Sequence, residues 1–377
     1  MRIVHYFAGR VNPEKAKVGS VHVLYYLSRA QKADGHEVDW YLVPRKSEYE
    51  NRGHGFGIFD YGKAKLFGLL PPLAVFAKFI RERKSINLVH LHGPFTQENI
   101  LISLCLFLLG IPYVISSHGS FSPGAMKGKY LLKLIYKYFF ALPICNSAKL
   151  VHVHTESDLQ EARNFGVTVS CVVAEHGSDH ISEKFSEKIK TELTPPIEIN
   201  PEKFNLLFLG RLDPWHKGLD ILIEAISALN NKDVNLFLIG PPKSRYKGVL
   251  EELVNRLELC DQVKILPPVY DLVKKINWYS SVDLFVHPSR FDVFPIAIYE
   301  ALAAGCPVMV TPGSQADDFV TDNKVGVVVD LNINSITNHL KSLFIEKERL
   351  ILYKYNSISA IGERTWKRTW EKMLTKL

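Results

Sequence analysis

The sequence predicts an α/β protein built from two doubly wound, Rossmann-like domains that face a cleft, and three observations point to this fold. Short apolar segments rich in Val, Ile and aromatic residues alternate with helical segments, which is typical of buried parallel sheets. The alternation pauses at residues 190–204, a polar stretch containing prolines that suits an interdomain linker, and then resumes. A length of 377 residues suits two or three domains better than a single core.

The N-terminal half starts with a strand pattern, RIVHYF, and a helical pattern follows at residues 20–35. The apolar run at residues 100–109 is too short to span a bilayer and fits a buried helix. The other strands of this half are expected at residues 36–43, 86–93, 112–119 and 150–155.

The C-terminal half repeats the pattern, with helices expected at residues 218–230 and 295–305. We therefore expect an N-terminal domain at residues 1–190 and a second domain at residues 200–358. Ligands of doubly wound folds bind at the carboxyl ends of the strands, so functional residues are sought there. The six strands of the second domain are expected at residues 205–210, 234–240, 263–268, 283–288, 306–311 and 326–330.

The composition indicates a folded protein, with 47% hydrophobic and 23% charged residues. Five cysteines lie far apart and form no Cys-X-X-Cys pair, which predicts a reduced, cytoplasmic protein without a zinc framework. The N-terminus has no apolar signal-peptide core, which favours the same location. We expect no nucleic-acid partner.

The net charge of +7 lies entirely in residues 1–180, which contain 21 Lys and Arg against 14 Asp and Glu. Residues 99–155 contain no acid, and two interpretations of their lysines stay open. One is an ordinary packed helix with lysines in water. The other is peripheral contact with an anionic membrane, such as the inner face of the cell membrane. The lysines in question are Lys127, Lys129, Lys133 and Lys137.

Two cations flank the expected end of a strand in the segment FLGRLDPWHKG. Arg211 follows the strand directly, and Lys217 precedes the start of a helix. Two cations beside a helix N-terminus suit an anion such as a phosphate or diphosphate. The alternative is a pair of surface cations flanking a loop.

The segment FDVFPIAIYEALAAG places two acids around one helix, which is expected to start near Pro295 and to stop at Gly305. Asp292 and Glu300 are then separated by roughly 12 Å of helix, too far for a glycosidase acid/base pair. They can instead hold opposite ends of one extended ligand, whose phosphate lies against the free N–H groups of the helix start. The alternative is that Asp292 caps the helix and Glu300 lies on the surface.

Together these segments resemble the retaining glycosyltransferases of family GT4, which have the GT-B fold. FDVFPIAIYE resembles their E-x7-E motif, with Asp in the first position, and FLGRLDPWHKG resembles their F-x-G-R-L…K-G segment. VGSVHVLYYLSRAQKADGHEV resembles the N-terminal Gly-Gly loop and helix, SSHGS the His-Gly segment, and AEHGSD the N-G-V-D strand exit. RTWKRTWEKMLTKL resembles the final helix, which implies that residues 359–377 cross back to the first domain.

The resemblance implies a role for each candidate residue. Glu300 binds the ribose hydroxyls of a nucleotide-sugar donor, and Arg211 and Lys217 neutralise its diphosphate. Asp292 contacts the hydroxyls of the donor sugar, and His118 faces that sugar from the N-terminal domain. The remaining donor contacts come from the backbone at Gly19, Phe294, Pro295 and Ile296.

Three departures from the family pattern affect these expectations. Asp292 is one methylene shorter than the usual Glu, which shifts the expected sugar contacts. Ser20 stands where a second Gly is usual, and His176 stands where Asn is common. No departure removes a cation or Glu300, so an active enzyme is expected.

The sequence predicts no metal site. Histidines 90, 92, 152 and 154 alternate along strand ends and are expected to be hydrogen-bonded rather than metal-bound. No Asp-x-Asp occurs, which is the usual metal clamp of the other large glycosyltransferase fold. Transfer is therefore expected to need neither a metal nor another cofactor.

The expected activity is retaining transfer of a hexose to a sugar or lipid-linked sugar acceptor, in bacterial polysaccharide synthesis. Family frequency favours UDP-glucose as donor and GDP-mannose second, with the base near residues 266–271. Two alternatives stay open. A sugar-nucleotide epimerase of the same fold would release nucleoside diphosphate without an added acceptor. A non-catalytic nucleotide-sugar-binding partner of another transferase would bind the donor without turnover.

Overall fold

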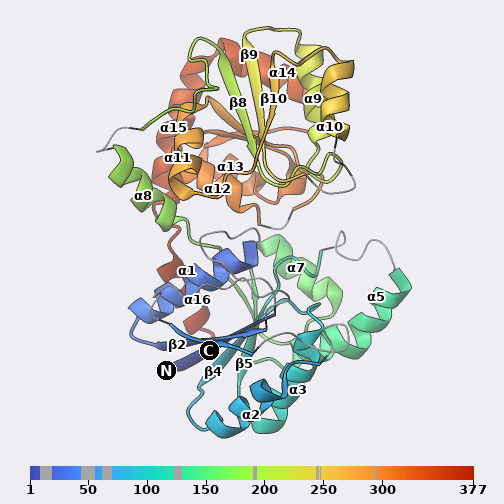
Figure 1. The fold of residues 1–377 in the computed structure, drawn as a ribbon, viewed down its shortest axis with the longest axis vertical. Helices are drawn as coiled ribbons and strands as arrows, with labels where there is room; N and C mark the ends of the chain where they lie inside the picture. The colour runs from blue at the N-terminus through green and yellow to red at the C-terminus, as the bar shows by residue number, and fades with distance from the viewer. Residues whose placement is uncertain are drawn as a thin grey trace. The chain divides into compact units, whose positions relative to one another are not determined.

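The computed structural model describes two compact units, Met1–Gly177 with Trp366–Leu377, and Ser178–Thr365. In each unit helices cover both faces of a central parallel sheet (Figure 1). The expected pair of doubly wound units is therefore confirmed. The described residues are 1–8, 19–43, 56–61, 70–122, 130–189, 193–242, 246, 248–292 and 294–377.

The sheet of the first unit has seven parallel strands in the order β3-β2-β1-β4-β5-β6-β7. Its central strands are buried on both faces and read as nearly continuous apolar runs, which is why their sequences predict strands so clearly. The strands are β1 (Arg2–Ala8), β2 (Glu37–Val43), β3 (Gly57–Asp60), β4 (Leu88–His92), β5 (Tyr113–Ser116), β6 (Leu150–Val153) and β7 (Cys171–Val173).

Each face of this sheet carries its own core. One face packs on α2, α3, α6 and α7, through residues such as Phe79 and Leu106. The other packs on α1 and α16, where Leu27, Trp366 and Trp370 are buried. The helices are α1 (Gly19–Ala33), α2 (Leu73–Glu82), α3 (Glu98–Leu109), α5 (Tyr130–Tyr136), the π-helix η3 (Lys137–Ala141), α6 (Leu142–Asn146), α7 (Glu156–Phe165) and α16 (Trp366–Leu374).

The sheet of the second unit has six parallel strands in the order β10-β9-β8-β11-β12-β13. All six coincide with the strands expected from the sequence. They are β8 (Phe204–Leu209), β9 (Val234–Ile239), β10 (Val263–Leu266), β11 (Leu284–His287), β12 (Val308–Val310) and β13 (Gly326–Val328).

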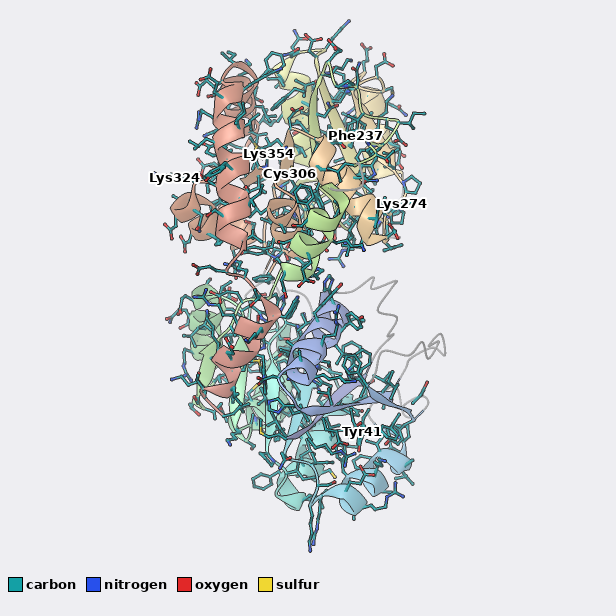
Figure 2. The ribbon with its side chains drawn as sticks, turned by 90° about the vertical axis from the view of Figure 1, so that its left-hand side faces the viewer. Tyr41, Phe237, Lys274, Cys306, Lys324 and Lys354 are labelled. Carbon is teal, nitrogen blue, oxygen red and sulfur yellow. The ribbon has the colours of Figure 1, made fainter. Side chains whose placement is uncertain are left out.

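Two cores also flank the second sheet, one under α9, α10 and α14 and one under α8, α11, α12 and α13. In Figure 2, Phe237 and Cys306 lie inside this unit, whereas Lys274 and Lys324 lie on its outside. The helices are α8 (Asp179–Ile189), α9 (Leu219–Leu229), α10 (Val249–Arg256), α11 (Leu272–Ser281), α12 (Ile296–Ala303), the 3-10 helix η5 (Pro312–Ser314), α13 (Asp317–Asn323), α14 (Ile333–Ile345) and α15 (Lys347–Ile361).

The division after Gly177 lies ahead of the linker expected at residues 190–204. The reason is α8, whose Ile181 and Phe185 are buried in a core of the second unit. The C-terminal segment joins the first unit from Trp366 onward, and α16 packs against α1. Among the described residues, no helix combines the length and apolar character that crossing a membrane requires.

The strand orders locate the switch point of each sheet, where neighbouring strands connect in opposite directions. In the first unit it lies between β1 and β4, and in the second between β8 and β11. Ligands of doubly wound sheets bind outside the carboxyl ends of the strands at this point. These two places are therefore where functional side chains are expected.

Candidate active site

The loops that follow β8 and β11 bring Lys217 and Asp292 into direct contact at the switch point of the second unit. Lys217 Nζ donates to Asp292 Oδ2, and His287 Nε2 lies 3.1 Å from the same oxygen. Lys217 is only 9% exposed, so its charge acts in a poorly screened environment. The ion pair is thus part of the folded site and not a chance surface contact.

The pKa values of this cluster favour a charged Asp292 and a neutral His287. Burial raises the pKa of Asp292, but the Lys217 ammonium and the His287 hydrogen bond outweigh it and bring the pKa below its ordinary value. Burial lowers the pKa of His287, and Lys217 lowers it further. A neutral His287 therefore donates to Asp292 from Nε2. Ser289 Oγ lies 3.0 Å from the same nitrogen.

Arg211 lies on the exposed side of the same cluster. Its guanidinium is 3.3 Å from His216 Nδ1, and His216 Nε2 donates to the carbonyl oxygen of Phe291 at 2.8 Å. The rings of His216 and Phe291 also stack, with centroids 4.0 Å apart. Burial, and next to it the charge of Lys217, lowers the pKa of His216. His216 thereby ties the two loops together without adding charge.

Two glycines allow the loops around Asp292 to approach closely. Gly218 has a φ of +63°, and a Cβ there would lie 2.0 Å from the carbonyl oxygen of Pro288. A Cβ on Gly313 would lie 2.3 Å from the carbonyl oxygen of Arg290. The Asp292 N–H donates to the Gly313 carbonyl at 2.6 Å, which fixes the backbone that carries the carboxylate.

Glu300 is held separately, on α12, by two residues of α11. Lys275 Nζ lies 3.0 Å from both carboxylate oxygens, and Tyr279 donates to Oε2 at 3.0 Å. Glu300 is only 2% exposed. Burial raises the pKa of Tyr279, and the Glu300 charge raises it further, so the phenol remains a donor. The carboxylate is thus fixed in orientation.

The helix between the two acids begins as expected. Pro295 is the N-cap and provides no side-chain cap, α12 starts at Ile296, and Gly305 follows its end with a φ of +73°. Phe294 stacks on Tyr299, with ring centroids 4.5 Å apart. The alternative interpretation of the two acids is wrong, because the N-cap of α12 is Pro295 and Glu300 is buried.

The remaining candidates, Gly19 and His118, belong to the first unit. Gly19 is the first residue of α1. His118 follows β5 and has a φ of +44°, which is uncommon for a residue with a side chain. Its Nε2 lies 3.0 Å from His92 Nδ1, and the ring of His154 lies beside it, with centroids 5.6 Å apart.

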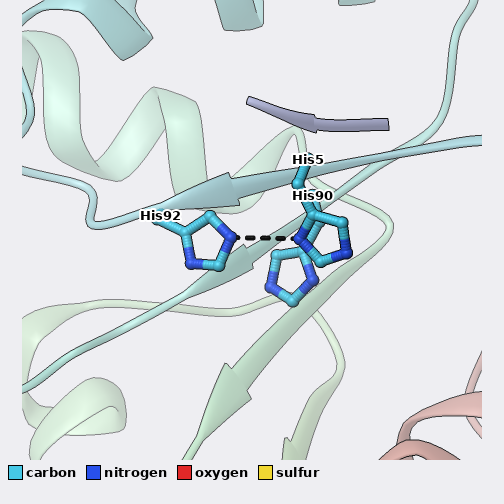
Figure 3. A group of neighbouring side chains, drawn as sticks. All are labelled: His5, His90 and His92. Carbon is cyan, nitrogen blue, oxygen red and sulfur yellow. Dashed lines mark hydrogen bonds between the residues drawn. The ribbon is translucent and has the colours of Figure 1, made fainter. Parts of the chain in front are cut away.

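The nitrogen atoms of His5, His90 and His92 are close enough to one another for a metal to be considered (Figure 3). The rings of His90 and His92 are nearly parallel, at 7° and with centroids 4.6 Å apart, so their in-plane lone pairs do not converge on one point. His90 Nε2 is also hydrogen-bonded to Ser116 Oγ at 2.7 Å. These contacts match the hydrogen-bonded histidines expected from the sequence.

Four contributors to the second-unit site were missed in the sequence. His287 ends β11, so the strand-end rule that selected Arg211 would also have selected it. Lys275 and Tyr279 are spaced i, i+4 on one helix face, but helical spacing does not reveal which acid they meet. The sequence indicated no role for His216 other than its position next to Lys217.

Two sequence models of known families match this chain. Residues 18–180 match the one described as Glycosyltransferase Family 4, and residues 189–358 match the one described as Glycosyl transferases group 1. The two matched segments correspond closely to the two units, and together they contain every candidate residue named above.

Curated relatives are similar over parts of the chain. The D-inositol 3-phosphate glycosyltransferase of Pseudarthrobacter chlorophenolicus is 29% identical over 150 residues, which are 39% of this chain and 35% of that protein. An uncharacterized glycosyltransferase of Methanocaldococcus jannaschii is 27% identical over 283 residues, 71% of this chain and 67% of that protein. The match thus spans only about a third of the length of the first relative.

Solved glycosyltransferase structures share the fold over the whole chain. HepE of Anabaena in complex with UDP-glucose has a TM-score of 0.74 at 18% identity, with 100% of both chains covered. Sucrose-phosphate synthase from Thermosynechococcus elongatus has a TM-score of 0.74 at 17% identity, covering 100% of this chain and 98% of that one. At these identities the likeness establishes the fold, and the expected GT-B class is confirmed.

Proposed function

Since this chain belongs to the group 1 glycosyltransferases of the family 4 type, we propose that it transfers a hexose from a nucleotide-sugar donor to a sugar or lipid-linked sugar acceptor, with retention of configuration. The observation that carries this proposal is the cluster at the ends of β8 and β11, where Lys217 and Asp292 pair beside Arg211. It lies at the switch point of a sheet whose fold binds ligands there.

Each part of the cluster suits one part of a nucleotide sugar. Lys217 has three N–H donors and uses one on Asp292, so it can also donate to a phosphate. Arg211 is exposed beside it and adds a second cation. Glu300, oriented by Lys275 and Tyr279, offers a carboxylate to the ribose hydroxyls. The backbone N–H groups of Phe294 and Ile296, on either side of Pro295, come after Asp292 and before Glu300 in the sequence and suit the diphosphate.

The proposed reaction breaks the bond between the anomeric carbon and the diphosphate oxygen. The electron pair goes to the diphosphate, where Lys217 and Arg211 stabilise the growing negative charge. The acceptor hydroxyl forms its bond to the anomeric carbon on the same face, and its proton passes to the departing phosphate. Asp292 and, from the first unit, His118 orient the sugar. Gly19 contributes a backbone N–H to the diphosphate.

UDP-glucose is the donor we propose first, and GDP-mannose second. The fold similarity to HepE, whose structure contains UDP-glucose, supports the first choice. The base would lie against residues 266–271, between the end of β10 and the Asp271 cap of α11. We place the enzyme in the cytoplasm, in bacterial polysaccharide synthesis.

A thermal-shift panel of UDP, GDP and ADP with their hexose derivatives tests the donor site. Ligand binding to the folded state adds about 2.7 kcal/mol to the free energy of unfolding when the ligand is present at 100 times its Kd. The melting temperature rises as a result. We expect UDP and UDP-glucose to raise it most. No shift with any of these nucleotides would contradict the proposal.

Product analysis then separates transfer from its two alternatives. Release of nucleoside diphosphate that requires an added sugar acceptor is expected of a transferase. Release without an acceptor would indicate an epimerase or hydrolase. Binding without any release would indicate a non-catalytic partner.

We propose that transfer needs no metal, because Lys217 and Arg211 already provide the positive charge that a metal would bring to the diphosphate. Activity should survive EDTA treatment and removal of the chelated ions. Complete loss that Mg²⁺ or Mn²⁺ restores would contradict this.

We also propose that the first unit binds an anionic membrane surface through residues 127–137 and their neighbours. Lys127 and Lys129 lie outside the described residues. Lys133 and Lys137 lie on α5 and η3, beside exposed apolar side chains. Tyr138 and Phe139 of η3 are 58% and 72% exposed, and Phe107 of α3 is 63% exposed.

Co-sedimentation with vesicles tests the membrane proposal. Each lysine near an anionic surface contributes about 1 kcal/mol, so binding should appear with phosphatidylglycerol vesicles, fade at high salt and be absent with phosphatidylcholine alone. The double change Lys133→Gln with Lys137→Gln should weaken it, and Phe139→Ser should weaken it at unchanged charge. Lys274→Gln with Lys324→Gln, which removes the same charge from the second unit, is the matched control. Wild-type protein that stays in the supernatant at low salt would contradict the proposal.

A further inference from the structure

Several polar side chains lie side by side on one face of the buried sheet of the first unit, because the strand register places them there. His5 pairs with His90 across β1 and β4, and His92 pairs with Ser116 across β4 and β5. In a parallel sheet, paired residues point to the same side, and residues two apart on a strand do too. The face they share is the one that α1 and α16 cover, so these side chains are enclosed and not exposed to water.

His5 and His92 form, together with His118 from the segment after β5, a continuous line of hydrogen bonds that ends at Gln31. His118 Nε2 lies 3.0 Å from His92 Nδ1, and His92 Nε2 lies 3.2 Å from His5 Nδ1. His5 Nε2 lies 2.7 Å from Gln31 Oε1 on α1. Every residue along this line except His118 is at most 5% exposed.

The three rings meet edge to edge, as hydrogen bonding requires. The centroids of His5 and His92 are 5.5 Å apart and those of His92 and His118 are 5.3 Å apart. For each pair of rings, the distance between centroids exceeds the N···N distance by about the width of one imidazole ring. The ring planes differ by only 24° and 17°, so the N–H vectors and lone pairs lie along one line.

All three rings are neutral, so each carries a single proton. Burial lowers the pKa of His5 to about 4 and that of His118 to about 3, and it lowers the pKa of His92 as well. A neutral imidazole donates from one nitrogen and accepts at the other. Fixing the proton of one ring in this line therefore fixes the others.

We propose that Gln31, through His5 and His92, holds His118 in the tautomer that carries its proton on Nε2. The amide oxygen of Gln31 accepts from His5 Nε2–H, which leaves His5 Nδ1 as an acceptor. His92 must then donate from Nε2 to His5, and His118 must donate from Nε2 to His92. His118 Nδ1 is left unprotonated and can accept a hydrogen bond from a hydroxyl group, but it cannot donate one.

Gln31 thus acts as a positioning residue for His118, and this inference rests on the proposed function for its catalytic meaning. If His118 faces the donor sugar, the line of hydrogen bonds from Gln31 makes His118 Nδ1 an acceptor for a sugar hydroxyl and holds the ring in place. Its backbone, at a φ of +44°, relies on such support because the left-handed region is unfavourable for a residue with a side chain.

A second line on the same sheet face provides an internal reference. His152 Nε2 lies 2.8 Å from the carbonyl oxygen of Ala174, which can only accept, so His152 carries its proton on Nε2. Its Nδ1 then accepts from Ser116, and Ser116 accepts from His90. This line does not include Gln31, so its tautomers should not respond to changes there.

The test is ¹⁵N NMR of histidine-labelled full-length protein, in which chemical shifts distinguish protonated from unprotonated ring nitrogens. Signals of His118 are assigned by their loss in His118→Gln. In the wild type, His118 should show a protonated Nε2 and an unprotonated Nδ1. A proton on Nδ1 would overturn the proposal, because it would mean that the line runs in the opposite direction. This measurement needs neither a variant of Gln31 nor transferase activity.

Variants of Gln31 then test what sets the direction. Gln31→Met keeps the volume but removes the acceptor, and we expect the Nδ1–H tautomer of His118 to appear while His152 stays unchanged. Gln31→Glu keeps an oxygen acceptor and should keep the wild-type tautomer. Ser28→Ala is the matched control, since Ser28 is buried on the same helix and accepts from Trp40 instead. An unchanged His118 tautomer in Gln31→Met would overturn the role of Gln31.

Kinetic measurements test whether this line of hydrogen bonds affects the transfer reaction. In Gln31→Met, kcat should fall about fivefold, the size of one hydrogen bond of about 1 kcal/mol, with nucleoside diphosphate affinity unchanged. An unchanged kcat in a variant whose tautomer has shifted would overturn the link to catalysis. If no transfer is found at all, the proposed function fails, while the NMR result still decides the tautomer.

Discussion

Replacing Lys217 with methionine is expected to lower kcat/KM by about 10²- to 10³-fold, the usual effect of losing one group that stabilises charge in the transition state. The side chain is only 9% exposed, so water screens its charge poorly, and the proposed site brings the growing charge of the diphosphate within reach of that ammonium. Steady-state kinetics with UDP-glucose, or with the donor that the thermal-shift panel selects, measures the loss.

A double variant distinguishes this loss from a disturbed site. Lys217→Met leaves the Asp292 carboxylate without its ion-pair partner, which is itself costly for a partly buried charge. Adding Asp292→Asn removes that unpaired charge, so stability should recover while the affinity for UDP stays low, since Asp292→Asn alone is expected to leave that affinity nearly unchanged. Lys324→Met, on an exposed lysine of the same unit, should leave both unchanged. Recovery of the wild-type affinity for UDP in the double variant would contradict the role of Lys217.

Glu300→Gln is expected to weaken nucleoside diphosphate binding by about 10- to 100-fold, because hydrogen bonds to a charged group contribute about 1.5–3 kcal/mol. The carboxylate is buried and oriented by Lys275 and Tyr279, so it can accept from both ribose hydroxyls without reorganising. Asp292→Asn should instead leave this affinity nearly unchanged and lower turnover, because Asp292 is assigned to the sugar. Calorimetric titration with UDP measures both.

Lys275→Met is the control for Glu300. It removes the cation that holds the carboxylate but keeps the carboxylate itself, so the affinity for UDP should fall less than in Glu300→Gln. Equal losses in Glu300→Gln and Asp292→Asn would contradict the division of the ribose and the sugar between the two acids.

The sequence was sufficient for the fold because both sheets are parallel and buried. Their strands, such as β8 and β9, are nearly continuous apolar runs that can be detected without knowledge of the partner strands. The first boundary was displaced for a local reason: α8 is amphipathic, and its pattern alone does not indicate which sheet it covers. The two strands that were not expected, β3 and β7, are short edge strands of the first sheet.

The candidate site was predictable where one side chain follows one strand. Arg211 and Lys217 after β8 and Asp292 after β11 are of this kind. Contacts between distant segments were not predictable. Lys275 lies 25 residues before Glu300, and their contact forms only once α11 packs against α12. Gln31 lies 26 residues after His5, and their contact forms only once α1 packs on the sheet.

The most direct test of the central claim, that the ends of β8 and β11 bind the diphosphate of the donor, is a crystal structure of this chain with UDP. The account predicts phosphate oxygens within hydrogen-bond distance of Arg211 and Lys217, and ribose hydroxyls on Glu300. An ordered UDP molecule whose phosphates lie away from both cations, or whose ribose contacts Asp292 instead of Glu300, would contradict it.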